Sequence, residues 1–329
     1  MENLERDVLA YQALTYSLKQ FWNHNKLDDY CKKLDEHFAK ICKQTNVDKD
    51  LLKTVSTLVS GFASELEKLS TPHLPVITNS IKKDDHNNTD KNTTPINLDK
   101  YFYPLAALEL SEKIFPKEIN SNWSEDFKKL WEAFWNEHKL LPTANLNVYL
   151  TSFVYLLHKY FWCLSATTSN KQYLGFSLYE QCRISAALAV CFYELVNGEV
   201  RNKEKDLLII EGDISGIQKF IYNPAFNGQE LQDGIARRLR GRSFYLNLLL
   251  KTLTDYLIGE LNLYNFNALW ATGGHFLIIA PNTQTAKNQL DDARGKIQKW
   301  MWKEFRGALG LIMTDVEIHN PLLSEKEKW

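Results

Sequence analysis

The sequence lacks any apolar run long enough to cross a membrane as a helix. Its first segment, MENLERDVLAYQ, is charged and lacks the apolar core of a secretory signal peptide. Neither a membrane partner nor export is therefore indicated by the sequence. We expect a cytoplasmic protein.

The sequence also lacks a charge excess, because 39 basic and 40 acidic residues leave a formal net charge of −1 at pH 7. Proteins that bind nucleic acid through their overall charge carry a marked basic excess. Any contact between this chain and a polyanion must therefore come from a local cluster of basic residues.

Cysteine is scarce, with five residues among 329, and no two cysteines have the Cys-x-x-Cys spacing of zinc and redox motifs. An odd number of widely separated cysteines is not the pattern of a disulfide framework. We interpret these residues as reduced side chains that fill cores, and we assign no metal site to the chain. The five are Cys31, Cys42, Cys163, Cys182 and Cys191.

Apolar residues make up 44% of the chain, which is enough to fill large cores, and the length predicts two or three domains. Helical spacing of apolar residues indicates helices through residues 1–78, and the polar segment 79–97 is predicted to be a flexible linker. Residues 98–204 are predicted to form a mostly helical linker region before a final domain at 205–329. The helices predicted in the linker region are 123–138, 145–164 and 176–197.

The final domain reads as strands that alternate with helices. In LLIIEGDISGIQKFIY (207–222), an apolar strand breaks at a Gly-Asp-Ile-Ser-Gly turn and opens into an amphipathic helix, and two later apolar runs meet at Gly273 and Gly274. This order, β-α-β-β-α-β, is that of a ferredoxin-like domain. We therefore predict an α+β protein in which the serine turn and the diglycine hairpin share one sheet. The predicted strands are 207–211, 266–271, 275–280 and 309–317, and the predicted helices are 216–222, 236–260 and 284–306.

Five motifs follow one another in the order of a known family. They are YFYPLAALELSEKIFP, FSLYEQCRISAALA, GDISGIQKFIY, LRGRSFYL and GGHFLIIAPN. Together they resemble the first Palm domain, and the linker before it, of the large subunit of type III CRISPR effector complexes, the cyclic-oligoadenylate synthetase family. The resemblance implies that residues 205–329 form a Palm domain and that residues 1–78 are a degenerate relative of the family's HD nuclease domain.

The sequence departs from this family at both catalytic motifs. An adjacent His-Asp pair helps to hold the metals of the family's nuclease domain, and this chain has no His-Asp dipeptide. The second Palm domain of the family holds magnesium with a Gly-Gly-Asp-Asp hairpin, whereas the hairpin here continues from Gly274 into His275 and Phe276. We therefore expect no DNase activity, assign no catalytic residue, and expect the chain alone to be inactive.

The serine turn and the diglycine hairpin are the candidate nucleotide site. In the family, two Palm domains face each other and hold two ATP molecules, and the resemblance places these two features on the first domain's side of that site. A helix start offers backbone N–H groups to phosphate, and glycine lets a ligand approach the backbone closely. The alternative is that Asp213 and Ser215 only cap the helix and that the glycines only close the hairpin. The candidate residues are Asp213, Ser215, Gly216, Gln218, Lys219, Gly273, Gly274 and His275.

A dense basic cluster lies in LRGRSFYL and the residues before it, with four arginines within six residues. Guanidinium groups at this density are candidates for contact with the phosphates of RNA or ATP, but a solvated helix face or contacts to a partner's carboxylates explain them equally well. The cluster consists of Arg237, Arg238, Arg240 and Arg242.

The aromatic residues near this cluster are predicted to belong to the core, since they fall on the apolar stripes of their helices. Of the two tryptophans Trp300 and Trp302, one is expected to pack on the sheet and the other to be exposed for a partner. The aromatic residues predicted to be core are Phe220, Tyr222, Phe244 and Tyr245.

We predict that the chain is a split or reduced large subunit of an RNA-guided, antiviral type III CRISPR complex. Its Palm domain would serve as a scaffold and as half of an ATP site for a partner Palm domain. The expected partners are the other subunits of the complex, a separate catalytic Palm half, and crRNA and target RNA through the complex. We expect no cofactor for the chain alone, whereas a partner that supplies ATP-bound magnesium would complete an oligoadenylate cyclase. Two alternatives stay open: a stand-alone ferredoxin-like RNA- or nucleotide-binding protein, and a homodimeric nucleotidyl cyclase.

Overall fold

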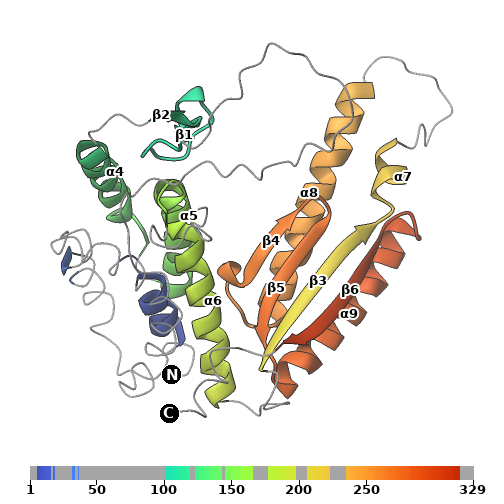
Figure 1. The fold of residues 1–329 in the computed structure, drawn as a ribbon. Coiled ribbons are helices and arrows are strands. Elements are labelled where there is room, and N and C mark those ends of the chain that lie inside the picture. The colour runs from blue at the N-terminus through green and yellow to red at the C-terminus, as the bar shows by residue number, and fades with distance from the viewer. Residues whose placement is uncertain are drawn as a thin grey trace, which may run out of the picture. The chain divides into compact units, whose positions relative to one another are not determined.

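The computed structural model divides the chain into two compact units, Met1–Ser185 and Ala186–Trp329, and each is considered by itself (Figure 1). The predicted linker at 79–97 and most of the predicted helical region 1–78 lie outside the described residues. In the parts of the chain that are described, no helix is long and apolar enough to cross a membrane. The structure describes residues 6–15, 18, 32–33, 36, 101–118, 123–142, 145–165, 177–197, 206–222 and 235–318.

The first unit is built around an aromatic core between two helices. Tyr11, on the helical segment 6–15, stacks on Phe153 with ring centroids 5.6 Å apart, and Phe134 lies 4.9 Å from Phe161. The side chain of Asn145 caps the second of the two helices by accepting hydrogen bonds from two backbone N–H groups of its first turn. The elements of this unit are β1 (Tyr101–Phe102), the 3-10 helix η2 (Glu112–Ile114), β2 (Lys117–Glu118), α4 (Trp123–His138) and α5 (Leu146–Phe161).

Helix α6 (Leu178–Asn197) starts in the first unit and ends in the second. The small and apolar side chains that its sequence places on one stripe, such as Cys182, Ala186 and Ala189, are fully buried. Burial raises the pKa of the Cys163 thiol to about 12, so this cysteine is an inert packing residue. Cys163, Cys182 and Cys191 are buried and free, which confirms the prediction for the cysteines that the structure describes.

The second unit is a four-stranded antiparallel sheet with two long helices on one face (Figure 1). The strand order is β4-β5-β3-β6, so the first and third strands of the unit lie in the centre. Mixed helix and antiparallel sheet is therefore the observed class, as predicted. The elements are β3 (Leu207–Ser215), α7 (Ile217–Tyr222), α8 (Ile235–Glu260), the 3-10 helix η4 (Asn265–Asn267), β4 (Ala268–Thr272), β5 (His275–Pro281), α9 (Gln284–Phe305) and β6 (Gly310–Ile318).

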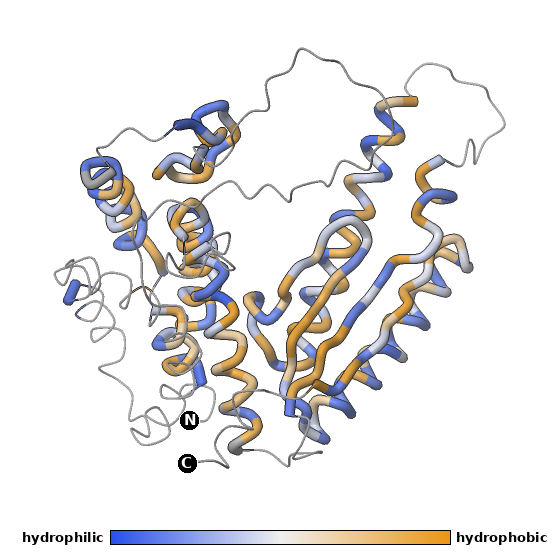
Figure 2. The backbone as a smooth tube through the Cα atoms, viewed as in Figure 1, coloured by the Kyte–Doolittle hydropathy of each residue, from blue (hydrophilic) through white to orange (hydrophobic). Residues whose placement is uncertain are grey.

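Side chains of β3 alternate between two faces, as expected for a strand with one face on a core. Leu208, Ile210 and Ile214 point to the face covered by α8 and α9 and are at most 2% exposed. Glu211 and Asp213 point to the opposite face and are exposed. Figure 2 shows the resulting run of hydrophobic residues along the central strands.

The predicted turn at residues 212–216 is wrong for four of its five residues. Strand β3 continues through Gly212 to Ser215, because Gly212 and Asp213 pair with both β5 and β6, and the pairing with β6 extends to Ser215. Only Gly216, with φ of 86°, leaves the strand. Hydrogen bonding to two neighbours outweighs the turn preference of glycine, aspartate and serine, which is a weak local tendency.

Three of the four aromatic residues predicted to be core near the arginine cluster are exposed, so the prediction is wrong for them, whereas Phe220 is half-buried against Tyr245 and Phe305. Tyr222 is 67% exposed, Phe244 is 64% exposed and Tyr245 is 43% exposed. Phe244 lies on the side of α8 opposite buried residues such as Leu246, and Tyr222 lies at the end of the short helix α7, so neither belongs to a covered stripe. Trp300 and Trp302 are both exposed, at 41% and 71%, so the expectation that one of them packs on the sheet is also wrong.

Candidate functional site

Three chain connections meet at the end of the sheet where β3 stops, near Gly216, the Gly273–Gly274 hairpin and Ala308. We call this end of the sheet the rim. The β4–β5 hairpin and the end of β3 are joined by a hydrogen bond from the backbone N–H of Ile214 to the carbonyl oxygen of Gly274, at 2.8 Å. The α9–β6 connection lies against the same turn, because a side chain at Gly216 would overlap the carbonyl of Ala308. The serine turn and the diglycine hairpin, which are about sixty residues apart in the sequence, are therefore neighbours.

The glycines of the rim have distinct roles. Gly216 and Gly274 have φ of 86° and 92°, and a side chain at either would overlap a neighbour, which for Gly274 is the side chain of Ile217. Gly273 has φ of 66°, but no atom lies within 4 Å of the position a side chain would take. The backbone of Gly273 is therefore open to an approaching group, whereas the other two glycines are needed for close packing.

Ser215 and Asp213 are strand residues, so neither caps a helix. The Ser215 hydroxyl donates a hydrogen bond to the carbonyl oxygen of Gly310 on β6, at 3.3 Å. Asp213 lies between His275 and Ile312 in the register of the sheet and is exposed. Helix α7 has only six residues, so its dipole adds little to anion binding at the rim. Gln218 and Lys219, which lie on α7, are exposed.

The open face of the sheet carries an acidic residue, Glu211, that the sequence analysis missed. His275 lies 2.7 Å from a carboxylate oxygen of Glu211 through Nε2, and the indole N–H of Trp270 donates to its Nδ1 at 3.4 Å. Because an indole nitrogen only donates, Nδ1 accepts and Nε2–H donates to the carboxylate. The signal for Glu211 was its spacing of two from Asp213 in a strand, which places both on the same face.

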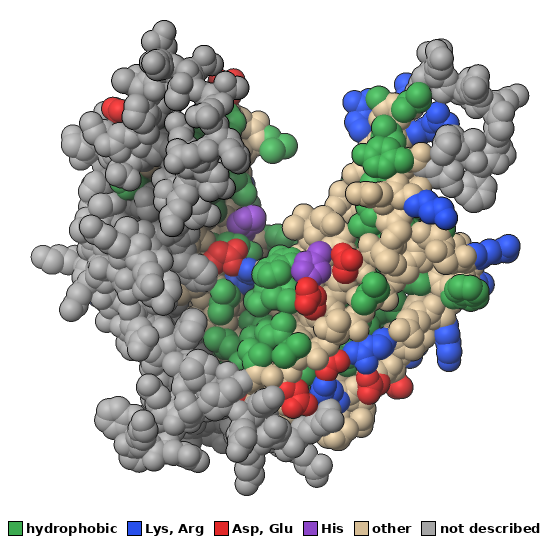
Figure 3. Space-filling model, turned by 45° about the vertical axis from the view of Figure 1, so that its right-hand side comes forward, with side chains coloured by type: hydrophobic (Ala, Val, Ile, Leu, Met, Phe, Trp, Pro, Cys, Tyr) green, Lys and Arg blue, Asp and Glu red, His purple; other side chains and the backbone are tan. Residues whose placement is uncertain are grey.

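This open face also presents exposed apolar side chains along its length. Ile312 is 59% exposed and Val316 is 56% exposed on β6, and Trp270 is 46% exposed on β4. Figure 3 shows apolar side chains next to histidine and acidic side chains on this side of the sheet. An apolar surface with a few polar groups is typical of a protein-binding face.

The four arginines lie on the first turns of α8 and not among the residues that form the rim. Arg242 is engaged within the fold, since it donates to the carbonyl oxygen of Ile221 at 2.9 Å and lies 6.0 Å from the ring centroid of Phe220. It therefore fastens α7 to α8. Arg237, Arg238 and Arg240 are exposed.

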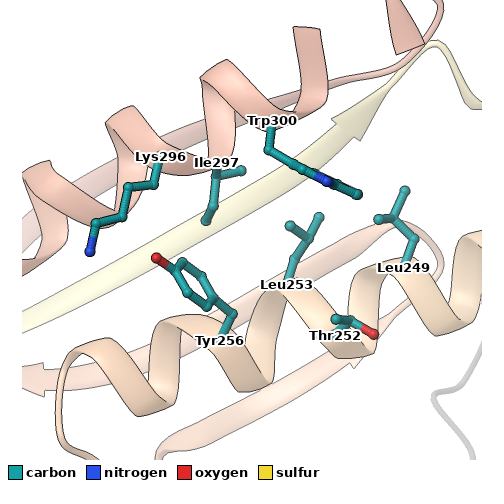
Figure 4. A pocket seen from close by; sticks show the side chains of 7 residues that line it. All are labelled: Leu249, Thr252, Leu253, Tyr256, Lys296, Ile297 and Trp300. Atoms are coloured by element: carbon teal, nitrogen blue, oxygen red, sulfur yellow. The ribbon is translucent and has the colours of Figure 1, made fainter. Parts of the chain in front are cut away.

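A separate apolar pocket of about 290 Å³ lies between α8 and α9 (Figure 4). Leu253 and Tyr256 of α8 face Ile297 and Trp300 of α9 across it. The amine of Lys296 at its edge is held by Glu260 at 2.7 Å, which raises the pKa of the lysine and lowers that of the carboxyl. The pocket offers no free charge to a phosphate, so it is not part of the candidate nucleotide site.

Among the described residues, no group of three or more histidine, cysteine, aspartate or glutamate side chains could hold a metal ion. Glu211, Asp213 and His275 lie on one face, yet they do not form such a group. The rim can therefore contact a nucleotide through backbone, hydroxyl and amide groups, but within these residues it offers no ligand set for magnesium.

Comparison with known proteins first defines the class of the sheet unit. Residues 206–329 match the family model described as Csm1 subunit domain B. The chain also has the fold of the crystal structure of Csm1 in T. onnurineus, with a TM-score of 0.69 at 22% identity over 98% of this chain and 48% of that one. A Csm1-Csm4 cassette in complex with one ATP gives a TM-score of 0.70, again at 22% identity, over 98% of this chain and 47% of that one.

The curated proteins that match this chain share one description. The chain is 34% identical over 218 residues to the single-strand-specific deoxyribonuclease Cas10/Csm1 (subtype III-A) of Thermococcus onnurineus, which is 64% of this chain and 26% of the relative. The corresponding protein of Enterococcus italicus is 32% identical over 168 residues, 46% of this chain and 22% of the relative. The chain thus spans about a quarter of the length of these relatives. Together the comparisons support a region of the type III CRISPR large subunit, Cas10/Csm1, and they confirm the resemblance seen in the sequence.

Proposed function

We propose that this chain is the scaffold half of a type III CRISPR large subunit, and that it contributes one side of an ATP site to a second Palm domain. In this proposal residues 205–329 are a ferredoxin-like Palm domain and residues 1–78 are a degenerate HD-like domain. The split or reduced form predicted from the sequence belongs to the same proposal. The second Palm domain supplies the acidic metal ligands.

The observation that carries the proposal is the rim. The backbone hydrogen bond between Ile214 and Gly274 joins the two motifs that the sequence resemblance assigns to the nucleotide site. The order β3-α8-β4-β5-α9-β6, with β3 and β5 in the centre of the sheet, supports the proposed ferredoxin-like arrangement. Two similar structures are cassettes with one ATP and with AMPPNP, which are nucleotides of the kind the proposal requires.

The residues of this chain would bind and orient the nucleotide rather than activate it. Gly273 exposes its backbone, and Gln218 and Lys219 offer an amide and an ammonium group from α7. These groups would contact phosphate or ribose oxygens of ATP, while the magnesium ions would be held by carboxylates of the partner. The open face beside the rim would receive the partner domain, because it presents exposed apolar side chains from β4 and β6.

The binding partners of the chain are also proposed from similar structures. Similar structures contain Csm1 together with Csm4, one of them as a subcomplex of the type III-A CRISPR-Csm interference complex. We propose that this chain joins such a complex through a Csm4-like subunit, and that crRNA and target RNA reach it through the assembly. A stand-alone nucleotide-binding protein and a homodimeric cyclase are the alternatives that the experiment must separate.

The test measures binding of a fluorescent ATP analogue and formation of oligoadenylate with magnesium. The chain is assayed alone and together with a purified Palm domain that carries a Gly-Gly-Asp-Asp hairpin. We expect nucleotide binding and product only in the mixture. Product from the chain alone would contradict the scaffold role in favour of a homodimeric cyclase, and equal nucleotide binding with and without the partner would favour a stand-alone binding protein.

The variant that tests the rim is Gly273→Asn. Asparagine tolerates a positive φ, and its side chain would project into the open space beside the backbone. We expect at least about a tenfold loss of ATP affinity in the mixture, equivalent to about 1.4 kcal/mol. The control is Gly259→Asn, at a glycine of α8 that also has open space. Unchanged affinity in Gly273→Asn would mean that the hairpin is only structural.

A further inference from the structure

The first turns of α8 form an exposed helical segment that the rest of the described chain does not cover. We call Ile235–Tyr245 the α8 arm. None of its side chains is buried, whereas Leu246, Leu249 and Leu250 directly after it are. Figure 1 shows the arm beyond the end of the sheet, next to α7. A helical segment of three turns that packs only on one side gains little stability by itself, so its open side is a surface that a partner would stabilise.

The two sides of the arm differ in their contacts. Arg242 and Tyr245 face α7, because the guanidinium bonds the carbonyl of Ile221 and the tyrosine ring lies 5.9 Å from that of Phe220. Arg237, Arg240 and Phe244 follow one another at spacings of three and four residues. Helical periodicity places these three on a single stripe, on the side opposite the core positions such as Leu246.

The outward stripe carries positive charge that no described group neutralises. The side chains of Arg237 and Arg240 are exposed, and neither has a hydrogen bond or ion pair with the described residues. Helix α7 and the arm contain five basic residues and no acid, while Glu230 and Asp233 of the intervening segment lie outside the described residues. Figure 3 shows the Lys and Arg side chains gathered at this end of the molecule.

This positive charge lies at the amino-terminal end of α8, where the helix dipole disfavours it most. The amino-terminal end of a helix carries a positive partial charge, so arginines in the first two turns are repelled by the dipole. No acidic residue occurs in the first turn of α8 to compensate. A bound polyanion would offset this repulsion. A chain of phosphates provides charge complementarity of this kind.

An exposed aromatic ring completes the stripe. Phe244 is 64% exposed, has no ring contact with another described residue, and lies one helical turn after Arg240. Aromatic rings beside a basic track provide stacking platforms for unpaired bases. A base inside a duplex cannot stack in this way, whereas every nucleotide of an unpaired strand offers a flat ring next to its phosphate.

We propose that the outward stripe of the α8 arm binds single-stranded nucleic acid, with Arg237 and Arg240 on successive phosphates and Phe244 stacked on a base. The proposal rests on the proposed function only for the source of the strand, which in a type III complex would be RNA. The binding itself is a property of this chain, so it can be tested without any second Palm domain.

The experiment is fluorescence anisotropy of the full chain with a labelled, unstructured oligoribonucleotide over a range of salt concentrations. Each phosphate neutralised on a single strand contributes about −0.7 to the slope of log affinity against log salt. We expect Arg237→Ala/Arg240→Ala to make this slope less steep by about 1.4. The matched control is Lys299→Ala/Lys303→Ala, which removes two exposed charges from α9 and should leave the slope unchanged.

Stacking is tested separately from charge. We expect Phe244→Ala to weaken binding roughly five- to a hundredfold without changing the salt slope, and Phe244→Trp to restore it. Trp302→Ala removes a ring that is 71% exposed on α9, and it should have no effect. Helix content measured by circular dichroism checks that each variant still folds.

Several results would overturn the proposal. These are unchanged affinity in the arginine variant, a Phe244→Ala effect no larger than that of Trp302→Ala, and equal binding of a duplex of the same sequence. Competition by polyglutamate as strong as that of the oligoribonucleotide would instead point to an acidic protein partner. A DNA strand bound as well as RNA would support the contact but identify DNA as a second source. Loss of RNA binding leaves the ATP assay at the rim untouched, so the two proposals fail independently.

Discussion

The two faces of β3 differ in what holds them in place. On the covered face, Ile210 and its neighbours are packed against α8 and α9 and are not accessible to a ligand. On the open face, Glu211 and Asp213 alternate with them along the same strand, yet they contact only neighbouring strands and solvent. One strand therefore serves both the core and the candidate site, and the two purposes are separated by a spacing of one residue.

This comparison teaches where substitutions should be tolerated. Covered positions are fixed by burial and packing, so they respond to changes in volume. Open positions near the rim make few contacts within the chain, so we expect their residue types to depend on a partner or ligand. The predictions below test this separation, beginning with the largest expected effect.

Truncation on the covered face should be the most damaging. We expect Ile210→Ala to lower the free energy of unfolding of the sheet unit by about 2 to 5 kcal/mol, because it leaves a cavity under the helices. Val316→Ala, on the open face at 56% exposure, should change it by no more than about 0.5 kcal/mol. Urea unfolding followed by circular dichroism measures both. Equal losses would show that the open face is also a packed layer.

The ion pairs under β6 should make stability depend on pH. Asp315 lies on the covered face and contacts Lys287 and Arg294 of α9, the latter at 2.7 Å. Burial alone would raise its pKa, but hydrogen bonds from these two cations outweigh it and hold the pKa below the usual range. The stabilisation is therefore complete above the unfolded pKa of about 4 and is lost as the pH falls.

We expect Asp315→Asn to cost about 1 to 3 kcal/mol at neutral pH. The difference from the unmodified chain should shrink as the pH falls from about 4 through the lowered pKa of the folded state, since the carboxyl then becomes protonated in the folded chain as well. Unfolding curves at several pH values measure this change. A difference that stays constant from neutral to acid pH would mean that the charge of Asp315 contributes nothing.

The smallest effect is expected at the open face. Glu211→Gln removes the charge that faces His275 but keeps the shape of the side chain, and exposed pairs of this kind contribute less than about 1 kcal/mol. We therefore expect near-normal stability together with weakened association with the partner Palm domain, measured by titration calorimetry. A large loss of stability without any change in association would place Glu211 with the covered face.

Much of the sheet unit could be predicted from the sequence. Each of its four strands and the helices α7, α8 and α9 was predicted. Only the β4–β5 pair joins consecutive strands, whereas β3 pairs with β5 and β6, which follow later in the chain. The errors fall where propensity competes with tertiary contacts. Asp213 and Ser215 were assigned to a turn, but pairing with β5 and β6 keeps Asp213 in β3, and pairing with β6 keeps Ser215 there. Whether the candidate residues bind nucleotide is still a prediction.

The sequence by itself determined the class of fold, the resemblance to the large-subunit family and the pair of glycine-containing motifs, since periodicity and motif order are properties of the chain alone. Only the tertiary structure decided which side chains are accessible. Phe244 and Leu246 are both apolar residues of one helix, and one is exposed while the other is buried because they lie on opposite sides of α8 and only one side is covered. The contact between Glu211 and His275 was also decided by the tertiary structure, because the two residues are distant in sequence and are brought together by strand pairing.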